Sequence, residues 1–159
     1  MWITEYCRYE GKWKNDKMDG IGHLSDYDGN EYFGDFKDNY RHGIGKKTNV
    51  DEYTYEGSWV YDRKEGNGQA FYSDGSKYSG NWSADKRYGE GQMNYNHGGI
   101  YKGNWIHDEP RGNGMWKTQK GTRIGYFEQN GLDGDGTHIL PNGCELKGTW
   151  KNGHLLDAK

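Results

Sequence analysis

The sequence predicts an all-β protein, an elongated single-layer antiparallel meander of repeated β-hairpins with no helical domain. The first observation is a fixed period: one aromatic residue per unit recurs in steps of 23, 23, 23, 23, 22 and 23 residues, at Trp13, Phe36, Trp59, Trp82, Trp105, Phe127 and Trp150. The second is a Gly-x-Gly pair that begins seven residues after each of the first six aromatics. The third is an alternation with a period of two inside each unit, which is typical of strands.

The clearest copy of the unit is Tyr55–Lys77, YEGSWVYDRKEGNGQAFYSDGSK. Its first run places an aromatic or glycine at every second position, at Tyr55, Gly57 and Trp59. A second run alternates in the same way, at Gly66, Gly68, Ala70 and Tyr72. We expect two short strands separated by a loop at 62–65 and closed by a tight turn at Asp74-Gly75. A helix is excluded because each interior glycine would destabilise it by about 1 kcal/mol.

The glycines share the face of the strand that carries the aromatic residues. Without a Cβ atom they leave shallow slots, and we expect neighbouring Tyr and Trp rings to lie over the bare backbone. The mean hydropathy of −1.29 would by itself indicate disorder. Tyr and Trp rings can nevertheless build a core, with their apolar bodies packed together and their polar tips in contact with water.

The repeats divide the chain into eight segments. We expect an N-terminal cap strand at 1–8, a C-terminal half repeat and short polar tail at 146–159, and six repeats at 9–31, 32–54, 55–77, 78–100, 101–122 and 123–145. Terminal repeats are commonly atypical, and in the sixth Arg123 stands where a Tyr is expected.

Composition, charge and cysteine usage exclude several classes of function. The net charge of −3 argues against nucleic-acid binding. No apolar run is long enough to span a bilayer, and the N-terminus does not resemble a signal peptide. Cys7 and Cys144 lie at opposite ends of the array, so we expect reduced thiols and a cytoplasmic protein. The six histidines show no metal-ligand spacing and no catalytic constellation is visible, so we expect no enzyme, cofactor or metal.

The pattern Tyr-x-Gly-x-Trp, six residues, Gly-x-Gly and then Asp-Gly resembles the MORN repeat (membrane occupation and recognition nexus). The resemblance covers Tyr9 to Trp150. The departures from it are Phe36 and Phe127 for Trp, Arg123 and Leu146 for Tyr, and Glu52 for the turn glycine. It implies a curved or twisted sheet of hairpins with an aromatic-lined groove. It also implies scaffolding in cytoskeletal and ciliary assemblies, partner binding and membrane-lipid association.

Two functional hypotheses follow. The first is a non-enzymatic scaffold, within a cytoskeletal or ciliary assembly such as a radial spoke, that binds a peptide or helix of a protein partner in an aromatic groove. The expected groove residues are Tyr32, Phe36, Tyr55, Trp59, Tyr78, Trp82, Tyr101 and Trp105. A strand of a partner, or of a second copy in a homodimer, could also add to a sheet end.

The second hypothesis is a peripheral membrane module that binds anionic phospholipids such as phosphoinositides. Its expected surface is a basic edge formed by Lys17, Arg41, Arg63, Lys64, Lys86, Arg87 and Arg111. Acids recur beside these cations, at Asp16, Asp38, Asp62, Asp85 and Asp108. Mixed charges of this kind favour a solvated face over a lipid-binding one.

Overall fold

A computed structural model of the chain describes residues 2–3, 6–129 and 131–159. These residues form fifteen strands and no helix. The strands are β1 (Trp2–Ile3), β2 (Cys7–Lys14), β3 (Lys17–Asp26), β4 (Glu31–Lys37), β5 (Tyr40–Asn49), β6 (Tyr53–Val60), β7 (Arg63–Tyr72), β8 (Lys77–Ser83), β9 (Lys86–Asn94), β10 (Ile100–Ile106), β11 (Glu109–Thr118), β12 (Gly121–Glu128), β13 (Gly131–Ile139), β14 (Glu145–Lys151) and β15 (His154–Ala158).

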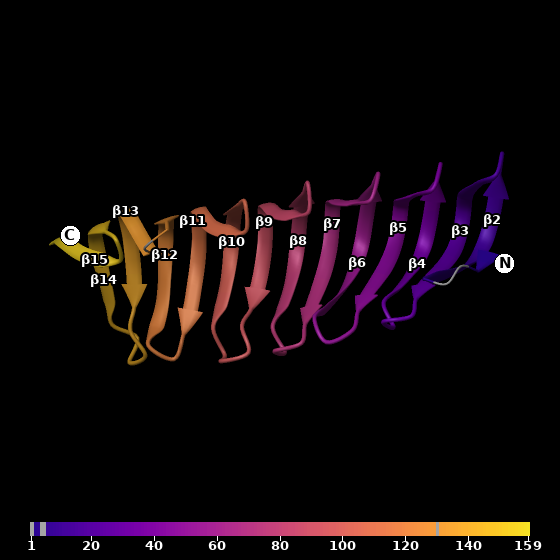
Figure 1. Cartoon of the computed structure of the whole chain (residues 1–159). Coiled ribbons are helices and arrows are strands. Elements are labelled where there is room, and N and C mark those ends of the chain that lie inside the picture. Colours follow the sequence, from indigo (N-terminus) through magenta and orange to yellow (C-terminus); the bar gives the residue numbers. More distant parts are fainter. Residues whose placement is uncertain (1, 4–5, 130) are drawn as a thin grey trace. The chain divides into compact units, whose positions relative to one another are not determined.

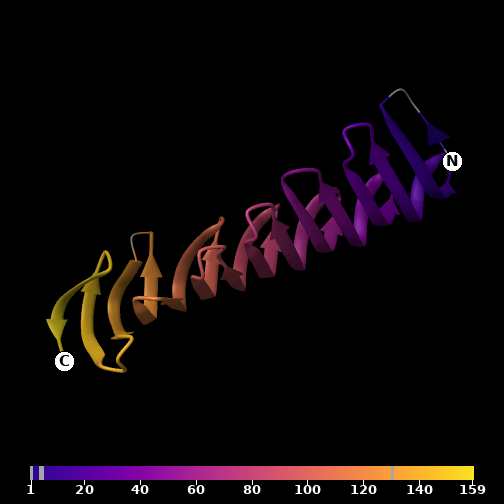
Figure 2. The same cartoon turned by 90° about the horizontal axis from the view of Figure 1, so that it is seen from below.

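The chain forms two compact units. The first comprises Met1–Gly75 with Trp82–Asp85, and the second comprises Ser76–Asn81 with Lys86–Lys159. In the first unit β1 to β7 are neighbours in chain order, and every pair is antiparallel (Figures 1 and 2). In the second unit β9 to β15 follow the same rule. The predicted all-β antiparallel meander of repeated hairpins is therefore confirmed.

The turn inside each hairpin is tighter than predicted. Strand β6 ends at Val60 and β7 begins at Arg63, so the expected loop at 62–65 is wrong. The two turn residues, Tyr61 and Asp62, have φ of 46° and 67°, the left-handed geometry of a type I′ turn. Such a turn matches the twist of the flanking strands, and its usual Asn-Gly signal is absent from this stretch. The same pair of left-handed residues occurs at Asn15-Asp16, Asp38-Asn39, Ala84-Asp85 and His107-Asp108.

The two ends of the chain also differ from expectation. Cys7 and Arg8, placed in the predicted cap strand, are the first residues of β2. Within the cap only Trp2–Ile3 is a separate described strand, with Trp2 opposite Tyr9; positions 1, 4 and 5 lie outside the described residues. The predicted polar tail contains a strand that was not expected, because β15 pairs with β14. Asn152-Gly153 is the type I′ turn that reverses the chain there, with φ of 50° and 76°.

The predicted packing of rings over glycines is confirmed. A Cβ atom added to Gly68 would lie 2.4 Å from the Tyr55 hydroxyl oxygen, and one added to Gly57 would lie 2.6 Å from the same atom. That hydroxyl donates a hydrogen bond to the Ser58 carbonyl at 3.0 Å. The arrangement recurs at Tyr9, Tyr32, Tyr78 and Tyr101, each of which donates to the carbonyl three residues later.

The rings form a continuous edge-to-face ladder inside each unit. In the first, Trp59 lies between Tyr32 and Tyr55, with centroids 5.5 and 5.1 Å away and near-perpendicular planes. In the second, Trp105 lies between Tyr78 and Tyr101, at 5.3 and 5.2 Å. Edge-to-face geometry is the favourable one for aromatic pairs. A single layer of rings therefore serves as the core of each unit.

Consecutive hairpins are joined at their turns by paired hydrogen bonds. The Asp62 carboxylate accepts from the Arg41 backbone N–H at 2.9 Å, and the Asp62 N–H donates to the Arg41 carbonyl at 3.0 Å. Asp85 makes the same pair with Lys64, and Asp108 with Arg87. Three of the five acids that were expected to form a solvated face, Asp62, Asp85 and Asp108, are therefore also structural links between one hairpin and the next.

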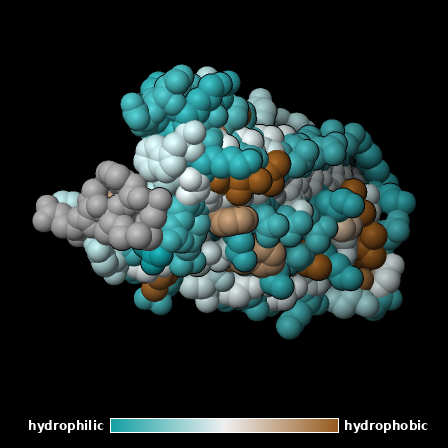
Figure 3. All heavy atoms as spheres, turned by 90° about the vertical axis from the view of Figure 1, so that its right-hand side faces the viewer, coloured by the Kyte–Doolittle hydropathy of each residue, from teal (hydrophilic) through white to brown (hydrophobic). Residues whose placement is uncertain are grey.

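None of the described residues forms a helix long and apolar enough to cross a membrane. Figure 3 looks at the N-terminal end of the chain, where hydrophobic residues appear as separate patches within a mainly hydrophilic surface.

Candidate functional site

The predicted groove residues form the core of the sheet. All eight side chains are buried, with between 0 and 4% of their surface exposed: Tyr32, Phe36, Tyr55, Trp59, Tyr78, Trp82, Tyr101 and Trp105. The expectation that these rings themselves line an open groove is corrected, because packing over glycine and against neighbouring rings covers them. A partner on this face would touch the side chains that lie above the rings.

Three of the covering side chains are cations. The Arg41 guanidinium lies 4.6 Å from the Trp59 ring centroid. Arg87 lies 4.5 Å from Trp105 in the second unit. The Lys64 ammonium lies 4.2 Å from Trp82. Each cation therefore stacks on the Trp of the following hairpin, a geometry in which the ring quadrupole attracts positive charge.

The two arginines are also held by carboxylates. Arg41 Nε donates to Asp62 at 2.8 Å, and Arg87 Nε donates to Asp108 at 3.0 Å. The arginine side chains are only 21% and 17% exposed. An arginine has five N–H donors, and Asp62 and Asp108 each take two from their arginine, at a carboxylate oxygen and at the backbone carbonyl. Donors remain on both guanidinium groups for a further acceptor.

The predicted basic edge is not one continuous row. Its seven residues occupy three positions in the repeat. Arg41, Lys64 and Arg87 cover the rings. Lys17, Arg63 and Lys86 are each the residue before the ring-covering position, so strand alternation turns their side chains to the opposite face. Arg111 pairs with Glu128 at 2.8 Å, and Lys17 pairs with Asp38 at 3.0 Å. Arg63 and Lys86 are exposed and make no ion pair with any described residue.

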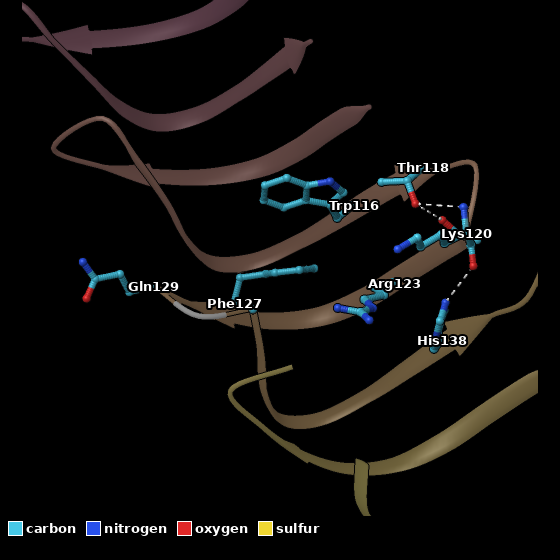
Figure 4. A pocket seen from close by; sticks show the side chains of 9 residues that line it. Trp116, Thr118, Lys120, Arg123, Phe127, Gln129 and His138 are labelled. Atoms are coloured by element: carbon cyan, nitrogen blue, oxygen red, sulfur yellow. Dashed lines mark hydrogen bonds between the residues drawn. The ribbon is translucent and has the colours of Figure 1, made fainter. Parts of the chain in front are cut away.

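A pocket of about 480 Å³ lies in the second unit (Figure 4). Its described lining residues are Trp116, Thr118, Lys120, Gly121, Arg123, Phe127, Gln129, Gly131 and His138. Three of them form a row across adjacent strands, because Arg123 on β12 is directly opposite Trp116 on β11 and His138 on β13. The sequence contained a signal for this site, the replacement of the repeat tyrosine by Arg123.

Burial shifts the pKa values of the tyrosine hydroxyls in the core. Desolvation raises the pKa of Tyr101 to about 12, and it raises the pKa of Tyr55 and Tyr32 further. The ring hydroxyls are therefore protonated at neutral pH and serve as hydrogen-bond donors. Burial, followed by repulsion from Arg41, lowers the pKa of Lys47 on the same face. Over the described part of the chain no group of three His, Cys, Asp or Glu side chains could hold a metal ion.

Hairpins that follow one another in chain order, five of them with a tyrosine over two glycines, define a β-repeat protein whose core is one layer of aromatic rings. The MORN repeat family model matches residues 9–31, 32–51, 55–77, 78–99 and 101–123. The chain belongs to the MORN repeat family, a family of non-enzymatic repeat scaffolds. The predicted sixth repeat lies beyond the matched residues, although β12 and β13 form a hairpin there.

One similar solved structure is the SAS-4 (dCPAP) TCP domain of Drosophila melanogaster, in complex with a proline-rich motif of Ana2 (dSTIL). Its sequence is 11% identical, the TM-score is 0.49, and the alignment covers 82% of this chain and 72% of that one. No curated protein matched the sequence.

Proposed function

We propose that this chain is a scaffold that binds a segment of a protein partner over the cation-covered rings, within a cytoskeletal or ciliary assembly. The observation that carries the proposal is the regular placement of a cation over the Trp of the next hairpin, as at Arg41 on Trp59 and Lys64 on Trp82. Such a surface offers a partner the unused N–H donors of Arg41 and Arg87, whose side chains are held flat over the buried rings. Arginine is among the residue types that most often anchor protein interfaces.

The spacing of the cations favours particular partners. Equivalent residues of successive repeats are two strands apart, or about 9.6 Å at the usual strand separation. A helix rises about 10.5 Å in seven residues, and an extended peptide in the polyproline II conformation rises about 9.3 Å in three residues and returns its side chain to the same face. We therefore expect acidic side chains seven apart in a helical partner or three apart in an extended one. A partner strand, or a second copy of the chain, could instead add to the edge of β15.

Photo-crosslinking in the native cell tests the proposal. A photoreactive residue would replace Lys47, which is half-buried on the ring-bearing face, and in a matched control it would replace Ile44, which is 61% exposed on the opposite face. We expect the Lys47 position to capture a defined protein and the Ile44 position to capture much less of it. Arg41→Gln should weaken that capture. Equal capture from both faces, or none from Lys47, would reject the proposal.

The alternative proposal is binding to anionic phospholipid. It is favoured by Arg63 and Lys86, which are exposed and have no described carboxylate partner. Co-sedimentation with phosphoinositide vesicles tests it at low and at physiological salt, because binding by exposed charges is screened by salt. Salt-sensitive binding that is lost in Arg63→Ala/Lys86→Ala would support a membrane role. Binding that is absent, or unaffected by these changes, would exclude it.

A further inference from the structure

The pocket in the second unit lies where a core ring is missing. In the preceding repeat the Tyr101 ring lies over Gly103 and Gly114 and packs against Trp105. Arg123 occupies the corresponding position of the sixth repeat, so no ring covers Gly125 and Gly136. Leu132 from the facing strand covers part of the vacant slot, since a Cβ atom added to Gly125 would lie 2.9 Å from a Leu132 methyl carbon.

Phe127 consequently has an aromatic neighbour on one side only. It meets Tyr101 edge to face at 5.5 Å, as the aromatics of the second to fifth repeats meet the tyrosine of the repeat before them. On its other side, where a tyrosine of its own repeat would lie, is the pocket (Figure 4). The loss of one ring therefore leaves a hollow bordered by an aromatic surface.

Trp116 supplies a second aromatic wall. The equivalent positions on the ring-bearing face of other repeats hold Leu24, Lys47, Ala70 and Met93. Trp116 lies 6.3 Å from Phe127, with ring planes inclined by 37°. It also stacks on Tyr95 at 5.7 Å and 9°, and Tyr95 stacks in turn on His97 at 5.4 Å and 8°. This stack of three rings holds Trp116 in position.

The remaining wall is basic. Lys120, Arg123 and His138 line the pocket, and none of its described lining residues is Asp or Glu. Arg123 is half-buried, and no ion pair or ring stacking joins it to another described residue, unlike Arg41 and Arg87. The imidazole of His138 is held at 3.2 Å from the Lys120 carbonyl, so its Nε2 carries the hydrogen. A half-buried arginine beside aromatic walls is a receptor for an anion rather than a solvated surface charge.

We propose that this pocket binds an organic anion, a carboxylate or phosphate carried on a planar aromatic body. Arg123 donates to the anion, with Lys120 adding charge, while Trp116 and Phe127 pack against the planar body. A volume of about 480 Å³ is within the range of small-molecule sites. The inference concerns only the second unit and is independent of the scaffold function proposed above.

Matched probes test separately the recognition of the anion and the recognition of the aromatic body. The probes are 2-naphthoate, 2-naphthyl phosphate, 2-naphthylmethylammonium and acetate, titrated into the full chain and followed by chemical shifts of the tryptophan indoles. We expect the two naphthyl anions to bind about tenfold or more tightly than the naphthyl cation, the effect of one charge-assisted contact. They should also bind about tenfold or more tightly than acetate, which lacks the aromatic body that packs against Trp116 and Phe127. The comparison of carboxylate with phosphate identifies the preferred anion.

The chain offers a variant that should fill the site. Arg123→Tyr restores the residue of the other repeats, so we expect a melting temperature no lower than that of the unmodified chain together with loss of binding. If the tyrosine variant does not fold, Arg123→Gln serves as the test. It removes the charge while retaining a similar length, and it should weaken the binding of both naphthyl anions about tenfold. Arg111→Gln, which alters an arginine paired with Glu128 outside the pocket, is the control and should bind normally.

Three results would overturn the proposal. The first is equal affinity for the naphthyl anions and the naphthyl cation, which would show an apolar site without charge selection. The second is undiminished binding by a folded Arg123→Tyr protein. The third is no shift with either naphthyl anion at millimolar concentration.

Discussion

Gly68→Ala tests the packing of rings over glycines, the interaction on which every unit depends. The new Cβ atom would lie 2.4 Å from the Tyr55 hydroxyl oxygen and within 2.6 Å of two ring carbons. To reach ordinary contact distance the ring must retreat by about 1 Å. Its hydroxyl would then leave the Ser58 carbonyl, and its edge contacts with Trp59 and Trp82, at 5.1 and 5.2 Å, would loosen.

The expected loss follows from these contacts. The hydrogen bond contributes about 1 kcal/mol, and overpacking a close-packed core costs about 1–3 kcal/mol. We therefore expect Gly68→Ala to lower the free energy of unfolding by about 2–4 kcal/mol. Gly136 is the matched control, because it holds the same repeat position without a tyrosine over it. A Cβ atom there would meet the Ile124 carbonyl at 3.0 Å and a flexible Leu132 methyl at 3.1 Å, so we expect a loss of about 1 kcal/mol.

Urea unfolding followed by tryptophan fluorescence and circular dichroism measures both losses. Repeat arrays can unfold in parts, so hydrogen exchange of β6 and β7 should accompany the global curves. Tyr55→Leu in the Gly68→Ala background removes the clashing hydroxyl and should recover part of the loss. Losses at Gly68 and Gly136 that agree within about 0.5 kcal/mol would refute the ring-over-glycine explanation.

Three further predictions concern charge. Asp62→Ala removes the carboxylate that accepts from both the Arg41 backbone N–H and Nε, so it should lower the free energy of unfolding in urea by about 1–3 kcal/mol. Lys17→Ala, which removes an exposed ion pair with Asp38, should lower it by less than about 0.5 kcal/mol. Because burial raises the pKa of Tyr101 to about 12, the folded state favours the protonated phenol. The free energy of unfolding should therefore be retained below pH 10 and fall as the pH rises towards 12. Phenolate absorbance should appear together with unfolding. Burial disfavours the charged form of Lys47, so Lys47→Met should raise the melting temperature at neutral pH; a lower value would show that the ammonium is stabilising.

Most of the fold could be predicted because the unit is short and local. The Tyr-x-Gly-x-Trp spacing puts rings and glycines on one face of a strand, and the fixed period forces neighbouring units into the same geometry. Turn positions were less predictable. At Tyr61-Asp62 and Ala84-Asp85, residues other than the usual Asn-Gly pair adopt left-handed φ values. The strands on either side, already paired on both sides, impose the turn on these residues.

The candidate sites were predicted only in part, since burial depends on what lies above a side chain. Tyr55 and Trp59 were correctly placed on one face, but the sequence could not show that they cover each other completely. Likewise Arg41 and Arg63 look equivalent as loop cations, yet one stacks on a ring and the other is exposed. A displacement of one residue along a strand reverses the face, so an approximate loop position is not sufficient to assign a surface.

The sequence by itself determined the all-β class, the repeated hairpins and the ring-over-glycine core, because these follow from a period of two within strands and of about 23 between units. Only the tertiary structure decided which side chains cover the rings and where a hollow remains. Arg41 reaches the Trp of the next hairpin and Asp62 reaches back to Arg41. Arg123 meets Trp116 and His138 across two strand pairings. Such contacts join different hairpins, and their geometry exists only once the strands are paired in register.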